Sequence, residues 1–315
     1  MTEVRFGVAM ASYQVEGAVG EDGRGESIWD VFCRRQGAVA GGDTGDVACD
    51  HYHRWREDLD LMASLGVESY RFSIAWPRVQ PEGRGALNRA GVDWYRRLCE
   101  GLLERGIEPV ATLYHWDLPQ ARQAVGGWAV RDTAERFADY AGLMADELGD
   151  LVAGWITHNE PWVVAFLGHA EGVKAPGIRD WPTALRVSHH LLLSHGLAVP
   201  ALRETAPVGI TLNLAPVRSE DPAAAARMDG YLNRWFLDPV LRGSYPADMV
   251  EHYERRFGPL ELDGLDVISR AIDFLGINYY SPQRVRSDPA RQPLEIGRGN
   301  PVSYTHLTLP TNREV

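Results

Sequence analysis

The sequence predicts a parallel α/β fold and, within that class, a (β/α)8 TIM barrel that is incomplete, with about six βα units present. Two observations support this prediction. Short apolar runs of strand length alternate with longer segments of helical periodicity, which is the pattern of βαβ units. Polar side chains follow these runs at their C-terminal ends, where a barrel of this kind builds its active site.

Each predicted strand is brief, apolar and bounded by turn-forming residues. In chain order the strands are expected over residues 6–12, 67–74, 108–114, 151–156, 207–214 and 272–277. Helices are expected over residues 50–65, 90–105, 131–148, 181–204, 223–241 and 246–256. Residues 20–46, rich in glycine and aspartate, are expected to form a loop.

A closed barrel needs eight units, and the sequence shows six. The segment after Tyr280 is expected to be a loop, and residues 303–315 have no helical period. We therefore expect residues 1–297 to form the N-terminal three-quarters of a single barrel. Residues 298–315 are expected to be a foreign or disordered tail.

Eight polar side chains lie at or just past the ends of the predicted strands. They are Gln14, Arg71, His115, Asn159, Glu160, Asn213, Asn278 and Tyr280. A doubly wound open sheet would bind ligands near one switch point and would usually carry a glycine-rich phosphate turn after its first strand. The segment Gln14-Val15-Glu16-Gly17 is not such a turn, so the barrel is the better interpretation.

The apolar run at residues 151–156 leads directly into Asn159, Glu160 and Trp162. A carboxylic acid at the tip of a buried strand retains its proton more readily than one in water, because desolvation disfavours the charged form. Such an acid beside an amide and an indole suits sugar chemistry. The alternative is that Glu160 merely caps the following helix, since the first turn of a helix favours acidic residues.

Composition narrows the class of partner. The chain has 315 residues, 45% of them hydrophobic, and a net charge of −11, which argues against nucleic acid and against an anionic membrane surface. No run reaches the ~18 apolar residues of a membrane span, and no signal peptide is visible. Three cysteines without a CxxC pair indicate a reducing compartment. We expect a cytoplasmic protein that binds small molecules; its oligomeric state is left open.

Two other motifs are weak. His51 and His53 form an HxH pair that could bind zinc, but no third ligand lies at a useful spacing, so a solvated or capping role is expected, as it is for His189 and His190. The glycine-rich residues 41–45 lack the preceding strand and following helix of a phosphate loop. Neither a zinc site nor a phosphate-binding loop is therefore expected from these two motifs.

Five motifs in order resemble the family 1 glycoside hydrolases, the β-glucosidases and their relatives. The resemblance covers residues 6 to about 289 and is specific because the motifs occur together. They are residues 6–18 (FGVAMASYQVEGA), 69–78 (SYRFSIAWPR), 113–119 (LYHWDLP), 157–164 (THNEPWVV) and 273–281 (DFLGINYYS).

The resemblance implies a retaining β-glycosidase that acts on terminal β-D-glycosyl residues through two glutamates, without a cofactor. Glu160 matches the acid/base, and Asn159 matches the amide that contacts the sugar 2-hydroxyl. The other matches place substrate-binding roles on Gln14, His115, Trp116, Trp162 and Asn278. Arg71 and Tyr280 match the pair that holds and polarises the nucleophile. The substrate would be a small β-glycoside or short oligosaccharide.

The family's nucleophile motif, an Ile/Thr-Glu-Asn-Gly segment at the end of strand seven, is absent from this chain. Glu16 and Asp117 could be considered as replacements, but they are expected instead to bond backbone amides and to position Gln14 and His115. The chain as given is therefore expected to be nearly inactive. The competing hypothesis is a non-catalytic sugar-binding or regulatory protein on the same fold. Absence of a ligand cluster or a strand-end lysine speaks against a metal-dependent isomerase or an aldolase.

Overall fold

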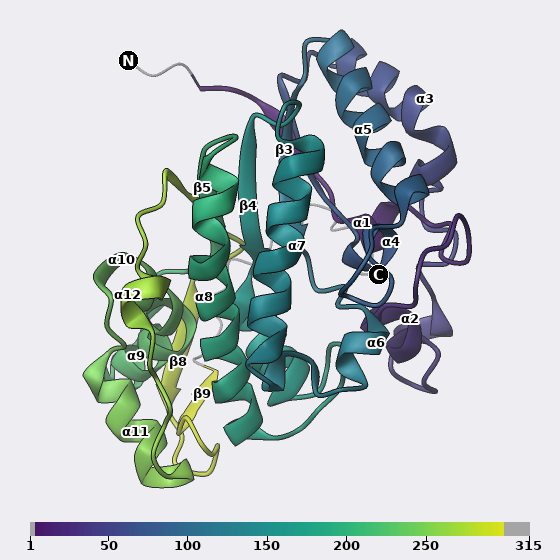
Figure 1. Cartoon of the computed structure of the whole chain (residues 1–315). Coiled ribbons are helices and arrows are strands. Elements are labelled where there is room, and N and C mark those ends of the chain that lie inside the picture. The colour runs from purple at the N-terminus through teal and green to yellow at the C-terminus, as the bar shows by residue number, and fades with distance from the viewer. Residues whose placement is uncertain (1–3, 299–315) are drawn as a thin grey trace.

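A six-stranded parallel sheet forms the centre of the molecule. The computed structural model describes residues 4–298, and its strand order is β1-β2-β3-β4-β5-β7 (Figure 1). Every neighbouring pair is parallel. The strands are β1 (Gly7–Ala9), β2 (Ser69–Ser73), β3 (Glu108–Tyr114), β4 (Gly154–Asn159), β5 (Val208–Asn213) and β7 (Phe274–Asn278). All six predicted strands are present, in the predicted order.

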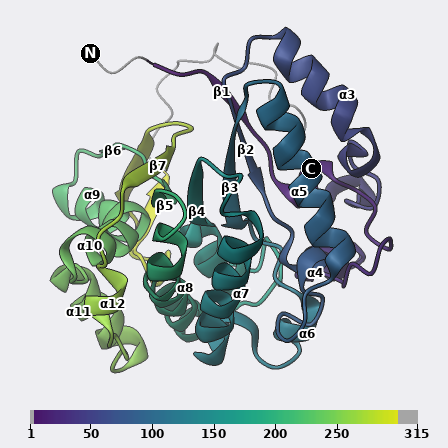
Figure 2. The same ribbon diagram turned by 45° about the horizontal axis from the view of Figure 1, so that its top comes forward.

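Four long helices connect these strands and pack against the sheet (Figures 1 and 2). They are α3 (His51–Ser64), α5 (Arg89–Glu104), α7 (Asp132–Leu148) and α8 (Trp181–Arg203), each within two residues of its predicted bounds. The apolar stripe of α7 is buried as its spacing predicts, with Phe137, Tyr140, Met144 and Leu148 fully enclosed. Because all neighbouring strands are parallel, their carboxyl ends lie at one edge of the sheet.

Short elements fill the strand-to-helix connections. They are α1 (Ser12–Val15), α2 (Ile28–Cys33), η1 (Ala40–Gly42), α4 (Trp76–Val79), α6 (Gln120–Gln123), η2 (Gly127–Ala129) and the π-helical turn η3 (Val163–Leu167). The prediction that residues 20–46 are only a loop is wrong at α2. Ser27 and Asp30 form a capping box there, which satisfies the first backbone donors of a helix too short to show a periodic pattern.

A second lobe follows β5. It contains α9 (Pro222–Asp229), the π-helical turn η4 (Gly230–Arg234), α10 (Trp235–Arg242), α11 (Ala247–Phe257) and α12 (Leu265–Ile268). The single helix predicted over residues 223–241 is thus divided by η4. The segment after Tyr280, predicted as a loop, contains β8 (Gln283–Ser287) and β9 (Ile296–Arg298), which join β6 (Val217–Arg218) in a small sheet. Only Val285 of β8 is buried, so the strand carries too little apolar signal to be recognised.

The main sheet is open on both sides within residues 4–298, because β1 and β7 each have a single strand neighbour. Ile277 on β7 and Tyr279 just after it are more than half exposed. Among the described residues, no helix is both long enough and apolar enough to span a bilayer.

Candidate active site

Glu160 lies immediately after β4 in a conformation that is unusual for its residue type. Its φ of 48° is in the left-handed region, which costs a non-glycine residue of order 1–3 kcal/mol. Two backbone hydrogen bonds hold it there: its amide donates to the carbonyl of Thr211 (2.8 Å), and its carbonyl accepts from the amide of Val163 (2.9 Å). Strain of this kind is typical of functional positions.

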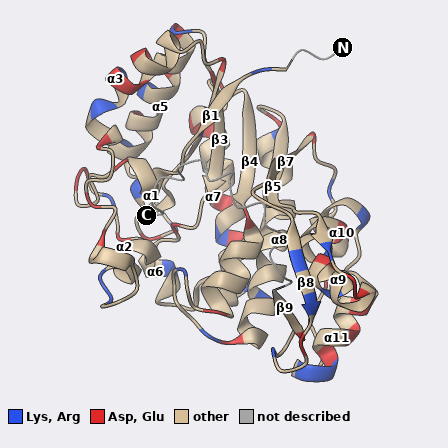
Figure 3. Cartoon of the chain, turned by 180° about the vertical axis from the view of Figure 1, so that it is seen from behind, with Lys and Arg blue, Asp and Glu red and all other residues tan. Residues whose placement is uncertain are grey.

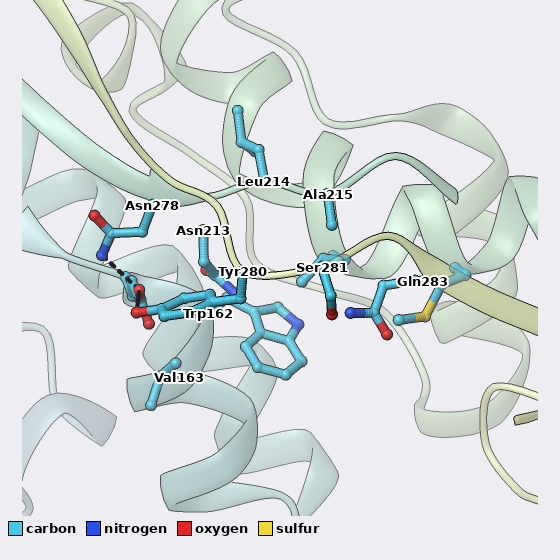
Figure 4. A pocket seen from close by; sticks show the side chains of 12 residues that line it. Trp162, Val163, Asn213, Leu214, Ala215, Asn278, Tyr280, Ser281 and Gln283 are labelled. Atoms are coloured by element: carbon cyan, nitrogen blue, oxygen red, sulfur yellow. Dashed lines mark hydrogen bonds between the residues drawn. The ribbon is translucent and has the colours of Figure 1, made fainter. Parts of the chain in front are cut away.

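The Glu160 side chain does not cap the following helical turn. It is buried, and its Oε1 accepts hydrogen bonds from Asn278 Nδ2 (2.5 Å) and from the Tyr280 hydroxyl (2.8 Å) (Figure 4). Both partners come from the end of β7, more than 100 residues away in the chain. Within residues 4–298 both hydrogen bonds are made to the same carboxyl oxygen, Oε1, and neither donor is an amide of the following helical turn. The geometry therefore argues against the alternative that Glu160 caps this turn.

Asn159 links the strand ends around Glu160. Its Oδ1 accepts from Arg71 Nη2 (2.6 Å) and from Asn278 Nδ2 (3.1 Å), which determines the orientation of the amide. Its Nδ2 therefore faces His115 Nε2 at 3.0 Å. The indole of Trp116 donates to the Asn159 carbonyl oxygen (2.8 Å), so β3 also fixes the backbone on which Glu160 depends.

The electrostatics keep His115 neutral. Burial, and secondarily the Arg71 guanidinium, lower the pKa of His115 to about 3. Because Nε2 accepts from Asn159, the proton of the neutral ring resides on Nδ1. Burial also lowers the pKa of Arg71, although the charge of Glu160 acts in the opposite direction. The ring can thus serve as a fixed hydrogen-bonding group near neutral pH.

Two adjoining hollows open at these strand ends. The larger, of about 410 Å³, is lined by Gln14, Arg71, His115, Trp116 and Asn159 among others. The smaller, of about 220 Å³, is lined by Glu160, Trp162 and Asn213 together with apolar side chains of the second lobe (Figure 4). Asn278 and Tyr280 line both hollows. The structure therefore brings all the strand-end residues singled out in the sequence to one region.

Sequence reasoning missed part of the smaller hollow. Gln283 and Ser281 belong to the segment predicted as a loop, and Met228 and Leu232 have the spacing of ordinary helical core residues. Apart from Ser281, the last residue of the motif at 273–281, these residues carry no signal in the sequence that separates them from packing positions.

The role expected for Glu16 needs correction. Glu16 does not bond backbone amides; it accepts hydrogen bonds from the side chains of Arg78 (2.9 Å) and Tyr95 (2.5 Å). Asp117 accepts a hydrogen bond from Ser12 Oγ (2.8 Å), and burial raises the pKa of Asp117 to about 7. Neither lines the two hollows.

Several histidines are less exposed than the sequence suggested. His51 is buried, and its Nδ1 lies 2.6 Å from Asp58, while His53 contacts Asp50 and Glu21. His189 is also buried and contacts the Tyr245 hydroxyl. The prediction that these side chains are solvated is therefore wrong for His51 and His189. Over residues 4–298 the structure groups no three His, Cys, Asp or Glu side chains that could hold a metal ion.

A six-stranded parallel sheet with a cluster of polar side chains at its carboxyl edge is the arrangement in which (β/α)8 enzymes build their active sites. The sequence profile described as Glycosyl hydrolase family 1 matches residues 2–305. The chain belongs to this family, as its motifs indicate. The match extends past residue 297, and residues 299–315 lie outside the described part of the chain, so the division at residue 297 stays a prediction.

Similar proteins agree with this assignment. Beta-glucosidase A of Acetivibrio thermocellus is 51% identical over 297 residues, which cover 91% of this chain and 66% of that protein. The AHE enzyme from Alicyclobacillus herbarius has a structure with a TM-score of 0.92 at 52% identity, covering 95% of this chain and 69% of the other. The Thermotoga maritima β-glucosidase in complex with deoxynojirimycin has a TM-score of 0.90 at 46% identity, with coverage of 95% and 69%.

The chain spans about two thirds of the length of the curated relatives it matches, between 60% and 69%. Its six parallel strands superimpose on part of the larger neighbouring structures. The predicted incomplete barrel is therefore confirmed as the fold of the described residues.

Proposed function

We propose that this chain carries the acid/base and sugar-binding parts of a retaining β-glucosidase site. The observation that carries the proposal is Glu160: a buried carboxyl that lines the smaller hollow and is held by Asn278 and Tyr280, which line both hollows. The printed names of several relatives, including Beta-glucosidase A, support a β-glucoside as substrate. The substrate would be a small β-glycoside or a short oligosaccharide.

In the proposed reaction Glu160 protonates the glycosidic oxygen as the leaving group departs, and its carboxylate later removes a proton from the attacking water. The larger hollow, with Gln14, His115 and Asn159, would hold the hydroxyl groups of the terminal sugar. The smaller hollow, with Trp162 on one wall, would hold the leaving group. Stacking on the indole face suits either an aryl group or a second sugar ring.

The covalent step of a retaining mechanism needs a second carboxyl group ~5–5.5 Å from the acid/base. Among the described residues that line the two hollows, Glu160 is the one carboxylate. We therefore propose that residues 4–298 do not supply the nucleophile. In this structure Tyr280 contacts Glu160, so its part in holding a nucleophile, like that of Arg71, belongs to the proposal.

Binding tests the sugar site in the 315-residue chain itself. Titration with deoxynojirimycin in a calorimeter should show saturable binding, which Gln14→Ala and His115→Ala each weaken about tenfold by removing hydrogen bonds to the ligand. Arg54→Ala, a change on the exposed face of α3, serves as the control and should bind as the unaltered chain does. Equal affinity in all four proteins would remove the assigned sugar site.

Turnover tests the acid/base assignment. The 315-residue chain should hydrolyse 4-nitrophenyl β-D-glucoside very slowly, since loss of a nucleophile costs orders of magnitude in rate. In any longer protein that contains this segment, Glu160→Ala should abolish cellobiose hydrolysis and affect activated aryl glucosides less, and azide should partly restore the rate. Undiminished cellobiose hydrolysis by the Ala variant would exclude Glu160 as the acid.

The second candidate is a sugar-binding protein without catalysis, which the single carboxylate in the two hollows favours. Saturable binding of deoxynojirimycin without hydrolysis by any longer form would select this alternative. A cytoplasmic location and the absence of nucleic-acid and membrane partners remain predictions from composition.

A further inference from the structure

A basic hollow of about 500 Å³ lies in the second lobe, apart from the hollows beside Glu160. It is lined by Arg227 of α9, by His252, Arg255 and Arg256 of α11, and by Gln292 and Glu295 of the turn between β8 and β9. Figure 3 shows blue at the end of α11 and along β8 on this part of the molecule. Such a concentration of arginine stands out in a chain whose net charge is −11.

The carboxylates nearby do not balance these cations. Glu295 pairs with Arg256, and Glu251 lies 3.6 Å from Arg255 in an exposed pair that contributes little. Arg227 has no carboxylate within 4 Å among residues 4–298, and its best contact is a long hydrogen bond to the Glu295 carbonyl (3.5 Å). One of the three guanidinium groups is thus without an anionic partner.

Arg227 also has an unsatisfied donor. Its Nε is enclosed and has no hydrogen-bond partner within the described residues. Buried polar atoms are nearly always paired, so an unpaired donor is unusual. Because this Nε is enclosed, the donors of Arg227 that face an anion in the hollow are those of its terminal nitrogens, whose one hydrogen bond among the described residues is the 3.5 Å contact of Nη2.

The lowered pKa of the buried His252 is consistent with the positive charge of the arginines in this hollow. Its Nε2 lies 2.8 Å from the carbonyl oxygen of Pro293 and donates to it, which orients the ring. Burial lowers the pKa of His252 first, and the charges of Arg256 and Arg227 lower it further, against the raising effects of the Pro293 carbonyl and Glu295. The ring is therefore neutral near pH 7, and the net charge of the hollow comes from the arginines.

We propose that this hollow is a binding site for a small phosphate-bearing anion, such as a phosphate ester. Guanidinium groups match phosphate oxygens with paired, charge-assisted hydrogen bonds. Arg227 and Arg255 are the two that have donors to spare, because Arg256 is occupied by Glu295 and the His252 carbonyl. The volume exceeds that of one phosphate group, so the remainder of an ester fits beside it.

The site stands independently of the glycosidase proposal. Arg227 faces this hollow, while Met228, the next residue of α9, lines the smaller hollow beside Glu160. An anion bound here needs no catalytic step, so binding can be measured whether or not the chain hydrolyses glycosides.

Calorimetry with inorganic phosphate and with pyrophosphate, at constant ionic strength set by sodium chloride, tests the proposal on the 315-residue chain. We expect saturable binding of one anion, tighter for pyrophosphate. Arg227→Gln and Arg255→Gln should each weaken it about tenfold, the loss expected for one charge-assisted hydrogen bond. Arg242→Gln, an exposed arginine of α10 outside the hollow, is the matched control and should bind normally.

Arg255 is largely exposed, so its variant is expected to fold even if the Arg227 variant does not. Absence of saturable binding, or equal affinity in the Arg255 variant, would overturn the proposal. Citrate distinguishes a phosphate site from a site for any polyanion. If citrate binds as tightly as pyrophosphate, the assignment to phosphate is wrong.

Discussion

Replacing Glu16 with glutamine should destabilise the protein strongly. Glu16 and Arg78 form a salt bridge of 2.9 Å in which the side chains are 5% and 0% exposed. The guanidinium also donates to the Gly17 carbonyl (3.0 Å) and lies 4.1 Å from the Tyr52 ring centre, so it cannot turn towards solvent. Removal of one partner of such a buried pair leaves an uncompensated charge and costs about 3–5 kcal/mol.

Urea unfolding followed by circular dichroism measures this loss. With a slope of about 3 kcal/mol per molar urea, the midpoint of Glu16→Gln should fall by about 1–1.7 M. The double variant Glu16→Gln with Arg78→Met removes the stranded charge and should recover most of the loss, since buried pairs often exchange for apolar residues at little cost. A midpoint within about 0.3 M of the unaltered chain would refute the reasoning, because the pair would then be solvated or dispensable.

Two further predictions concern stability. Burial lowers the pKa values of His169 and His195 to about 4 and also lowers those of His158 and His189, so the unfolded chain binds more protons between pH 4 and 6.5. Thermal stability should therefore fall as pH drops through that window. The raised pKa values of Asp117, Glu171 and His53 act in the opposite direction, but these groups are fewer than the lowered histidines. A melting temperature that is flat or rises on acidification would contradict this. Gly209→Ala places a Cβ 2.6 Å from a carbonyl oxygen of β7 and should cost about 1–3 kcal/mol, whereas Gly154→Ala, whose Cβ has its nearest neighbour at 3.6 Å, should leave the urea midpoint unchanged. Equal midpoints for the two variants would show that the sheet tolerates the added atom.

The strands of the main sheet could be predicted because their signal is local. A run such as Glu108–Tyr114 is apolar except at Glu108 and Thr112, as expected for a parallel strand covered on both faces, and its ends are marked by turn-forming residues. The helix at residues 28–33 was missed because six residues are too few to show a period, and its stability depends on the capping box of Ser27. The strand at residues 283–287 was missed because its stability comes from pairing with β6 and β9, not from its own composition.

The residues of the candidate site could be found because strand ends can be located along the chain. The residues with which they form hydrogen bonds could not be predicted. The contact from Tyr280 to Glu160 spans 120 residues, and the contact from Asn159 to His115 spans 44. Such pairs depend on the lateral order and register of the strands, which no local pattern specifies.

The amino-acid sequence by itself determined the alternation of strands and helices, the family, and the position of the candidate carboxyl at residue 160, because each depends on short local motifs. The tertiary structure alone decided that Asn278 and Tyr280 hold that acid, that Glu16 neutralises Arg78, and that Arg227, Arg255 and Arg256 gather around one hollow. The physical reason is that hydrogen bonds and charge pairing act over a few ångströms in space, and packing of the sheet and helices brings together residues that the chain keeps far apart.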